Sequence, residues 1–110
     1  MNTSQLIGAA ILAPRENRKQ AEDCALYLCA IHSAVCTAIT CQSSPDCGRI
    51  LDSERAVYVE RKRDEKPCGV MCVQCFDKHA DKWSALETRG FAFYDARELR
   101  RIARALGMLI

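Results

Sequence analysis

The 110-residue chain lacks a hydrophobic run long enough to cross a membrane. The apolar stretch from Leu6 to Ala13 is far shorter than the roughly 20 residues that a transmembrane helix needs, and no basic residue precedes it as in a secretion signal. We therefore expect a cytoplasmic protein without a membrane partner. In that reducing compartment, cysteines clustered in a small protein more often hold a metal ion than form disulfides.

Strong charge of one sign and low-complexity segments are also missing. The net charge of +2 is too small to indicate nucleic-acid binding by itself. No internal repeat or linker rich in Gly and Ser is present, and 49% hydrophobic with 27% charged residues is typical of a folded globular protein. The length suits one domain over residues 1–110. We divide it into a helical part (1–40), a part similar to zinc fingers (41–89) and a C-terminal part with a basic amphipathic helix (90–110).

Three segments before residue 90 have helical patterns. Ser4 can cap a short helix over residues 5–12, which a proline ends. Apolar residues then recur at three- and four-residue steps over 14–40, which predicts the longest helix. A third helix fits residues 73–89, with Gly90 as a left-handed stop.

The rest of the pattern mixes extended pieces with one more helix. Short strands are expected where β-branched and aromatic residues alternate with small or polar ones, at residues 50–51, 56–60 and 69–71. The last helix runs from Ala96 to about Leu106, and Gly107 ends it. Asp95 and Glu98 have the spacing of a capping box at its start.

The eight cysteines carry the chemistry. A structural zinc takes four donors in a tetrahedron, usually from two close pairs. Cys72 and Cys75 are one pair, because a two-residue gap lets the backbone fold into a tight knuckle. Cys47 fits the end of the other knuckle, since the glycine at position 48 permits a positive dihedral angle. Cys41 is its best partner, although their gap of five residues is wider than usual.

The predicted Zn²⁺ ligands are therefore Cys41, Cys47, Cys72 and Cys75. A knuckle, a strand pair and a second ligand pair at the head of a helix resemble a treble-clef or zinc-ribbon finger over about residues 41–86. The resemblance implies a structural zinc and no reaction. With the helices on either side, we expect an α+β fold: a small, mostly helical domain around a zinc-finger hairpin.

Other residues could act as ligands. Cys68 and His79 are reserves, since either could replace the first cysteine of the set. Cys29, His32 and Cys36 share one face of the long helix and could form a second metal site. Packing is the simpler explanation for this second group, because free cysteine behaves as a small hydrophobic residue.

Two alternative chemistries rest on the same cysteines. Cys68, Cys72 and Cys75 have the spacing of the iron–sulfur ligands in radical enzymes that use adenosylmethionine. The chain is too short for the barrel of those enzymes, so the alternative is an iron–sulfur redox sensor with a fourth thiol from elsewhere.

The fragment SERA at 53–56, followed by PCG at 67–69, resembles zinc-dependent cytidine deaminases. Ser53 stands where that motif has a ligand, and three residues rather than two separate the two thiols that follow. The segment between Glu54 and Pro67 is also too short for the intervening structure. A deaminase-like enzyme is therefore a remote alternative.

The last helix offers a surface for a partner. Arg97, Arg101 and Arg104 form one stripe with Arg100 beside it, and such a stripe can bind phosphates or carboxylates. We expect a regulator or adaptor without catalysis that binds a nucleic acid or a nucleic-acid-processing protein. Alternatively, the apolar tail 108–110 binds a protein, as an inhibitor or adaptor would, or a second copy of the chain.

Overall fold

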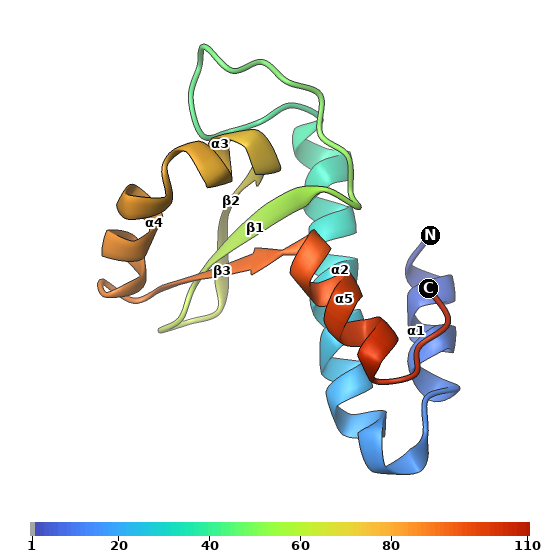
Figure 1. Cartoon of the computed structure of the whole chain (residues 1–110). Coiled ribbons are helices and arrows are strands. Elements are labelled where there is room, and N and C mark those ends of the chain that lie inside the picture. The colour runs from blue at the N-terminus through green and yellow to red at the C-terminus, as the bar shows by residue number, and fades with distance from the viewer. Residues whose placement is uncertain (1) are drawn as a thin grey trace.

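The computed structural model describes residues 2–110 and has a mixed α+β fold, as predicted (Figure 1). In chain order the elements are α1 (Thr3–Ile11), the 3-10 turn η1 (Arg15–Asn17), α2 (Arg18–Ala38), β1 (Ala56–Arg61), β2 (Lys66–Cys72), α3 (Val73–Lys78), α4 (Ala80–Glu87), β3 (Phe91–Asp95) and α5 (Ala96–Ala105). Within the described range, no helix combines the length and the apolar character that crossing a membrane requires.

The three strands form one antiparallel sheet in the order β2-β1-β3. Because side chains alternate along a strand, neighbouring residues of β3 pack on opposite faces. Tyr94 stacks on Tyr27 of α2 with 4.0 Å between the ring centroids, whereas Phe93 lies 5.7 Å from Trp83 of α4. Helix α2 therefore covers one face of the sheet and α4 the other.

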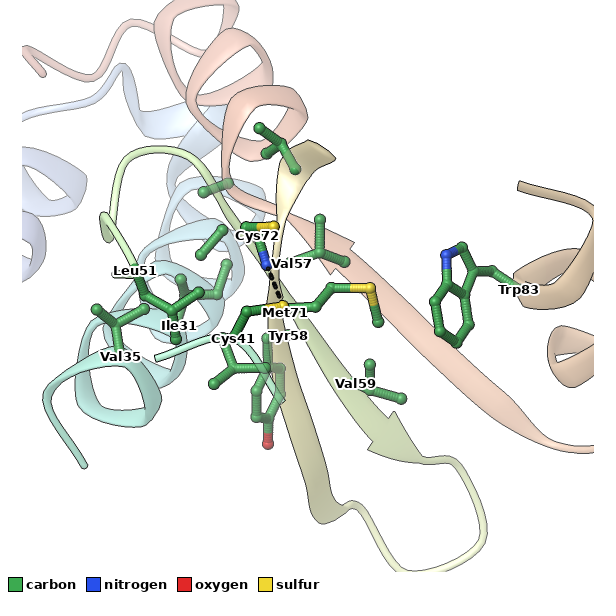
Figure 2. Close-up of a cluster of buried hydrophobic side chains, with 14 residues drawn as sticks. Ile31, Val35, Cys41, Leu51, Val57, Tyr58, Val59, Met71, Cys72 and Trp83 are labelled. Carbon is green, nitrogen blue, oxygen red and sulfur yellow. Dashed lines mark hydrogen bonds between the residues drawn. The ribbon is translucent and has the colours of Figure 1, made fainter. Parts of the chain in front are cut away.

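Two clusters of buried side chains hold these elements together. The first lies around the sheet and includes Ile31, Val57, Met71 and Trp83 (Figure 2). The second joins α1, α2, α5 and the C-terminal tail, and its members include Leu6, Ala21, Leu28, Ala103 and Met108. Met108 is buried and completes this core, whereas its neighbour Leu109 is exposed.

Both capping arrangements differ from their sequence predictions. Asn2 caps α1, because its side chain accepts the amide of Gln5 and the Gln5 side chain accepts the amide of Asn2. Ser4 lies inside the helix instead. At α5, Asp95 accepts the amide of Arg97, but the Glu98 carboxylate binds a guanidinium one turn later and does not close a capping box.

Three other segments also differ from the secondary structure predicted from the sequence. The helix expected over 73–89 is split at His79, whose φ of −115° and ψ of 37° redirect the chain so that Trp83 can cover the sheet. The expected strand at 50–51 is reduced to one bridge between Ile50 and Thr40. The segment after Gly90 forms β3, which the pattern did not predict, and Gly90 itself has the positive φ expected of a stop.

Ile39 turns the chain from α2 into the cysteine-containing loop under strain. Its φ is 67°, a region that β-branched residues rarely adopt, and its side chain is largely exposed. We expect Ile39→Gly to raise the free energy of unfolding by about 1 kcal/mol, because the strain relieved exceeds the added entropy of glycine in the unfolded chain. Urea unfolding measures this. Ile39→Ala keeps a Cβ and should gain less; the reverse order would contradict the strain.

Candidate metal centre

Four cysteine sulfurs meet at one point of the structure. Those of Cys41, Cys47, Cys72 and Cys75 all lie within 4.8 Å of one another. The Cys47 sulfur is 3.5 Å from that of Cys75 and 3.8 Å from that of Cys72. Thiolates about 2.3 Å from a tetrahedral ion stand about 3.8 Å apart. The group could therefore hold a metal ion such as zinc.

The loop that carries the first two cysteines is tied to the edge of β2. Gln42 exchanges two hydrogen bonds with Val70, one through its backbone amide at 3.0 Å and one through its side-chain oxygen at 3.1 Å. The amide of Cys72 donates to the Cys41 sulfur at 3.3 Å (Figure 2). Gly48, directly after Cys47, has a φ of +57°, the positive dihedral expected there.

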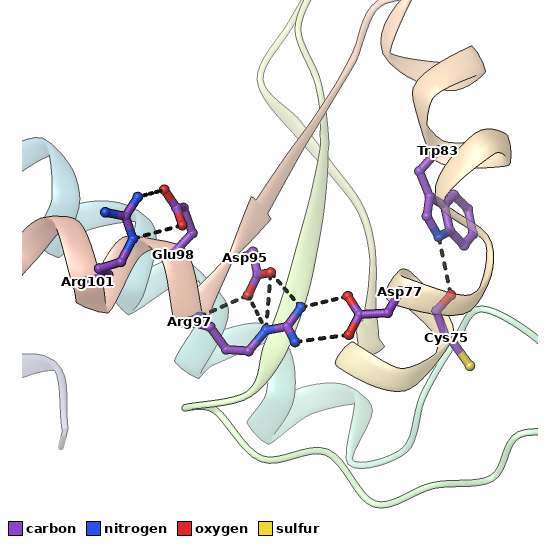
Figure 3. Close-up of polar contacts among 7 residues, drawn as sticks. All are labelled: Cys75, Asp77, Trp83, Asp95, Arg97, Glu98 and Arg101. Carbon is purple, nitrogen blue, oxygen red and sulfur yellow. Dashed lines mark hydrogen bonds and ion pairs between the residues drawn. The ribbon is translucent and has the colours of Figure 1, made fainter.

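The second pair comes from the junction of β2 and α3. Cys72 occupies the N-cap position of α3 and Cys75 lies in its first turn. The Trp83 indole N–H donates to the Cys75 carbonyl at 3.4 Å (Figure 3), which fixes the far side of this turn. The group thus takes two cysteines from the loop before the β1–β2 hairpin and two from the strand–helix junction after it.

The surroundings of the four cysteines shift the pKa values of two of their thiols in opposite directions. Burial raises the pKa of the Cys41 thiol, but hydrogen bonds with Ser43 and the Cys72 amide outweigh it and hold that pKa below its usual value. At Cys75 a hydrogen bond with Ser43 lowers the pKa, whereas burial and the neighbouring thiols raise it well above its usual value. Ionisation of one thiol therefore disfavours ionisation of the thiol beside it, unless a bound cation neutralises both charges.

The reserve ligands lie outside the group. Cys68 is exposed on β2, with its sulfur 3.5 Å from the Lys66 carbonyl. His79 stands at the break between α3 and α4, where its ring meets the edge of Trp83. Neither replaces a sulfur of the four.

The predicted second site is not assembled as a set of three. The His32 Nε2 atom lies 3.8 Å from the Cys36 sulfur, but the Cys29 sulfur lies 3.9 Å from the carbonyl of Thr3. Across residues 2–110, only the four-cysteine group brings three or more potential ligands to one ion.

Arg97 is not a free cation of the α5 surface. Its guanidinium donates to both carboxylate oxygens of Asp77 at 3.0 and 2.9 Å, and to Asp95 at 2.8 Å (Figure 3). Hydrogen bonds to Asp77, then to Asp95, raise the pKa of Arg97. Because Asp77 belongs to α3, this arginine clamps the helix that carries Cys75 to the start of α5.

The other arginines of α5 also have partners. Arg100 lies 3.7 Å from Glu54, and Arg101 pairs with Glu98 one turn earlier. The Nε atom of Arg104 donates to the terminal carbonyl of Ile110 at 3.3 Å. Of the residues in the SERA and PCG fragments, Glu54 thus lies beside α5, whereas Cys68 is exposed on β2.

Two contacts that shape the centre could not be predicted from the sequence. The Arg97–Asp77 contact joins positions 20 residues apart, and no spacing rule links them. The link from Trp83 to Cys75 spans eight residues and depends on the break at His79.

Comparison of the chain with protein-family models, with curated proteins and with solved structures gave no match. The chain is an α+β protein in which four cysteines, two from a loop and two from a strand–helix junction, are placed where they could bind one metal ion.

Proposed function

We propose that this protein is a zinc-binding adaptor or regulator in which the metal is structural. The observation that carries the proposal is the spacing of the four sulfurs, two of whose separations are 3.5 and 3.8 Å, close to the edge of a zinc tetrathiolate. Thiolate ligands favour zinc over hard cations.

The donor set supports a role without catalysis. Four thiolates fill a tetrahedral zinc, whereas a catalytic zinc keeps one position for water or substrate. Cys41 and Cys72 are also buried, so the ion would lie between the loop and the start of α3, away from bulk solvent. Binding there would join segments that are 25 or more residues apart in the chain.

A zinc in this place would organise the surface that a partner meets. It would hold the loop 41–47 against β2 and α3. Through the contact between Asp77 and Arg97 it would also fix the start of α5. The proposed adaptor therefore presents its helices in one defined arrangement only when the metal is bound.

The partner that these contacts favour is a protein. All four arginines of the predicted nucleic-acid surface already bind carboxylates or a carbonyl. Phosphates would have to displace those partners, so a nucleic acid is the less favoured alternative. The tail offers less than its composition suggested, because Met108 is buried and only Leu109 is largely exposed.

Metal analysis of protein purified without added metal tests the proposal. We expect one zinc per chain and a colourless solution. After replacement by Co²⁺, the protein should show the intense visible bands of a tetrahedral thiolate complex, because all four ligands are sulfur. Cys68→Ser is the matched control, since this thiol is exposed and outside the group; its metal content should be unchanged.

Other outcomes would decide against zinc. Brown protein with iron and sulfide would identify an iron–sulfur cluster in the same four thiols. Protein that is free of metal and takes up neither Zn²⁺ nor Co²⁺ would contradict any metal-based function.

A further inference from the structure

A hollow with an acidic lining lies between α2 and the β1–β2 hairpin, outside the cysteine group. Its volume is about 370 Å³. It is lined by Asp23, Leu26, Tyr27, Ala30, Glu60 and Glu65. Three of these residues are carboxylates and none is basic. Asp23 already pairs with Lys19 at 3.3 Å, so Glu60 and Glu65 are the two of the three without a basic partner in the described range.

Glu60 is the side chain that makes this hollow more than an acidic patch. It is only 8% exposed, and it is the single charged residue among the buried ones in the described range. The Tyr58 hydroxyl donates to its Oε2 atom at 3.2 Å. Its Oε1 atom receives no hydrogen bond, and no Lys, Arg or His nitrogen of residues 2–110 lies within 4.0 Å of the carboxylate.

A cation would stabilise a carboxylate in this position. Removing a carboxylate from water is costly unless an opposite charge replaces the lost hydration. Burial and the neighbouring Glu60 raise the pKa of Tyr58 to about 12, so this phenol stays protonated and can donate to the Glu60 carboxylate. One hydrogen bond on one oxygen leaves the charge itself without a counterion inside the protein.

The aromatic wall of the hollow suits an organic cation. Tyr27 stacks on Tyr94 with an angle of 15° between the rings, so its ring is held in one orientation. Aromatic faces attract ammonium and guanidinium groups. Leu26, which is 62% exposed, and Ala30 add apolar surface on which an alkyl stem could lie.

We propose that this hollow binds the side chain of a lysine or arginine from a partner protein. The charged end would pair with Glu60, with Glu65 beside it, and the stem would lie against Leu26 and Tyr27. The proposal rests on the proposed function in one respect, that the partner is a protein. A hard dication is disfavoured, because the three carboxylates of the hollow do not come together as a set that could share one ion.

The test is a titration of the full-length, ¹⁵N-labelled protein, as purified, followed by amide NMR spectra. The probes are N-acetyl-lysine methylamide and N-acetyl-arginine methylamide, with the uncharged N-acetyl-norleucine methylamide as the matched control. We expect both cations to shift the amides of Tyr27, Ala30, Glu60 and Glu65. The norleucine derivative should leave them in place, because it has a stem but no charge.

Variants separate the carboxylate from general surface charge. Glu60→Gln keeps the size and the hydrogen bond to Tyr58, and it should weaken both cations about tenfold or more. Tyr27→Leu should weaken them about two- to fivefold by removing the aromatic face. Glu16→Gln removes an exposed carboxylate from η1 and should change nothing. The spectrum of each variant without probe shows whether the fold is kept.

Four results would overturn the proposal. Two concern specificity: the norleucine derivative binds as well as the cations, or Ca²⁺ binds more tightly than both cations at the same amides. The other two are an unchanged affinity in folded Glu60→Gln and Tyr27→Leu, and no shift of these amides at the highest soluble concentration of the lysine and arginine derivatives. Retained zinc without cation binding would remove only this inference. Cation binding by a protein that takes up no zinc would remove only the metal-based function.

Discussion

Cys72→Ser is expected to abolish stoichiometric zinc binding and to unfold the region around the sheet. Cys72 carries one sulfur of the group, and its amide holds Cys41, so the change removes a ligand at the junction of the hairpin and α3. Structural zinc in small domains contributes roughly 10–16 kcal/mol, which is comparable with the whole stability of a typical domain, about 5–15 kcal/mol. Circular dichroism and metal content measure both effects.

The fluorescence of Trp83 should report the loss of the metal directly. Trp83 is the single tryptophan of the chain, it is buried, and its indole N–H binds the carbonyl of Cys75. A strong chelator should therefore shift its emission to longer wavelength as the turn opens and the ring meets water. Added Zn²⁺ should reverse the shift.

Cys68→Ser provides the comparison for both measurements. This thiol lies on the same strand, four residues before Cys72, but it is exposed. It should keep the melting temperature, the metal and the emission of the natural protein. If Cys72→Ser behaves in the same way as Cys68→Ser, and chelation changes neither signal, the metal does not hold this fold together.

Ile31→Ala is expected to destabilise the protein by about 2–5 kcal/mol, because it leaves a cavity in the core around the sheet. Ile31 lies on α2, is fully buried, and belongs to the cluster that joins this helix to the sheet (Figure 2). In a protein of this size each kcal/mol lowers the melting temperature by several degrees, about 2–8 °C. Thermal unfolding followed by circular dichroism measures the loss.

The matched control for this substitution lies five residues earlier on the same helix. Leu26 is 62% exposed, so Leu26→Ala should change the stability by less than about 0.5 kcal/mol. Equal losses in the two variants would show that α2 does not pack on the sheet through Ile31.

Helices α2 and α5 could be predicted from local patterns, as could the two glycine stops that follow α4 and α5. A stripe of apolar residues at helical spacing marks α2 and α5, and the positive φ values of Gly90 and Gly107 are properties that glycine alone adopts without cost. The predicted cap of α1 differs from the observed one by two residues, because Asn2 and Ser4 are both good caps and only the reciprocal hydrogen bond from Gln5 distinguishes them.

The strand β3 could not be predicted in the same way. Residues 91–94 alternate too briefly to indicate a strand, and they are extended because β1 offers them a free edge. The break at His79 is likewise a result of packing, since an unbroken helix would carry Trp83 away from the carbonyl of Cys75. Both features depend on partners that are distant in the sequence.

The cysteine spacings by themselves determined which thiols are candidates, because a two-residue gap and a glycine after a ligand are local requirements of a knuckle. Only the tertiary structure decided that Cys41, Cys47, Cys72 and Cys75 converge and that Cys68 does not. It also decided that the arginines of α5 are engaged and that Glu60 is buried without a counterion. The reason is that charge and thiol chemistry depend on neighbours in space, and those neighbours are set by how α2, the hairpin and α3 pack together.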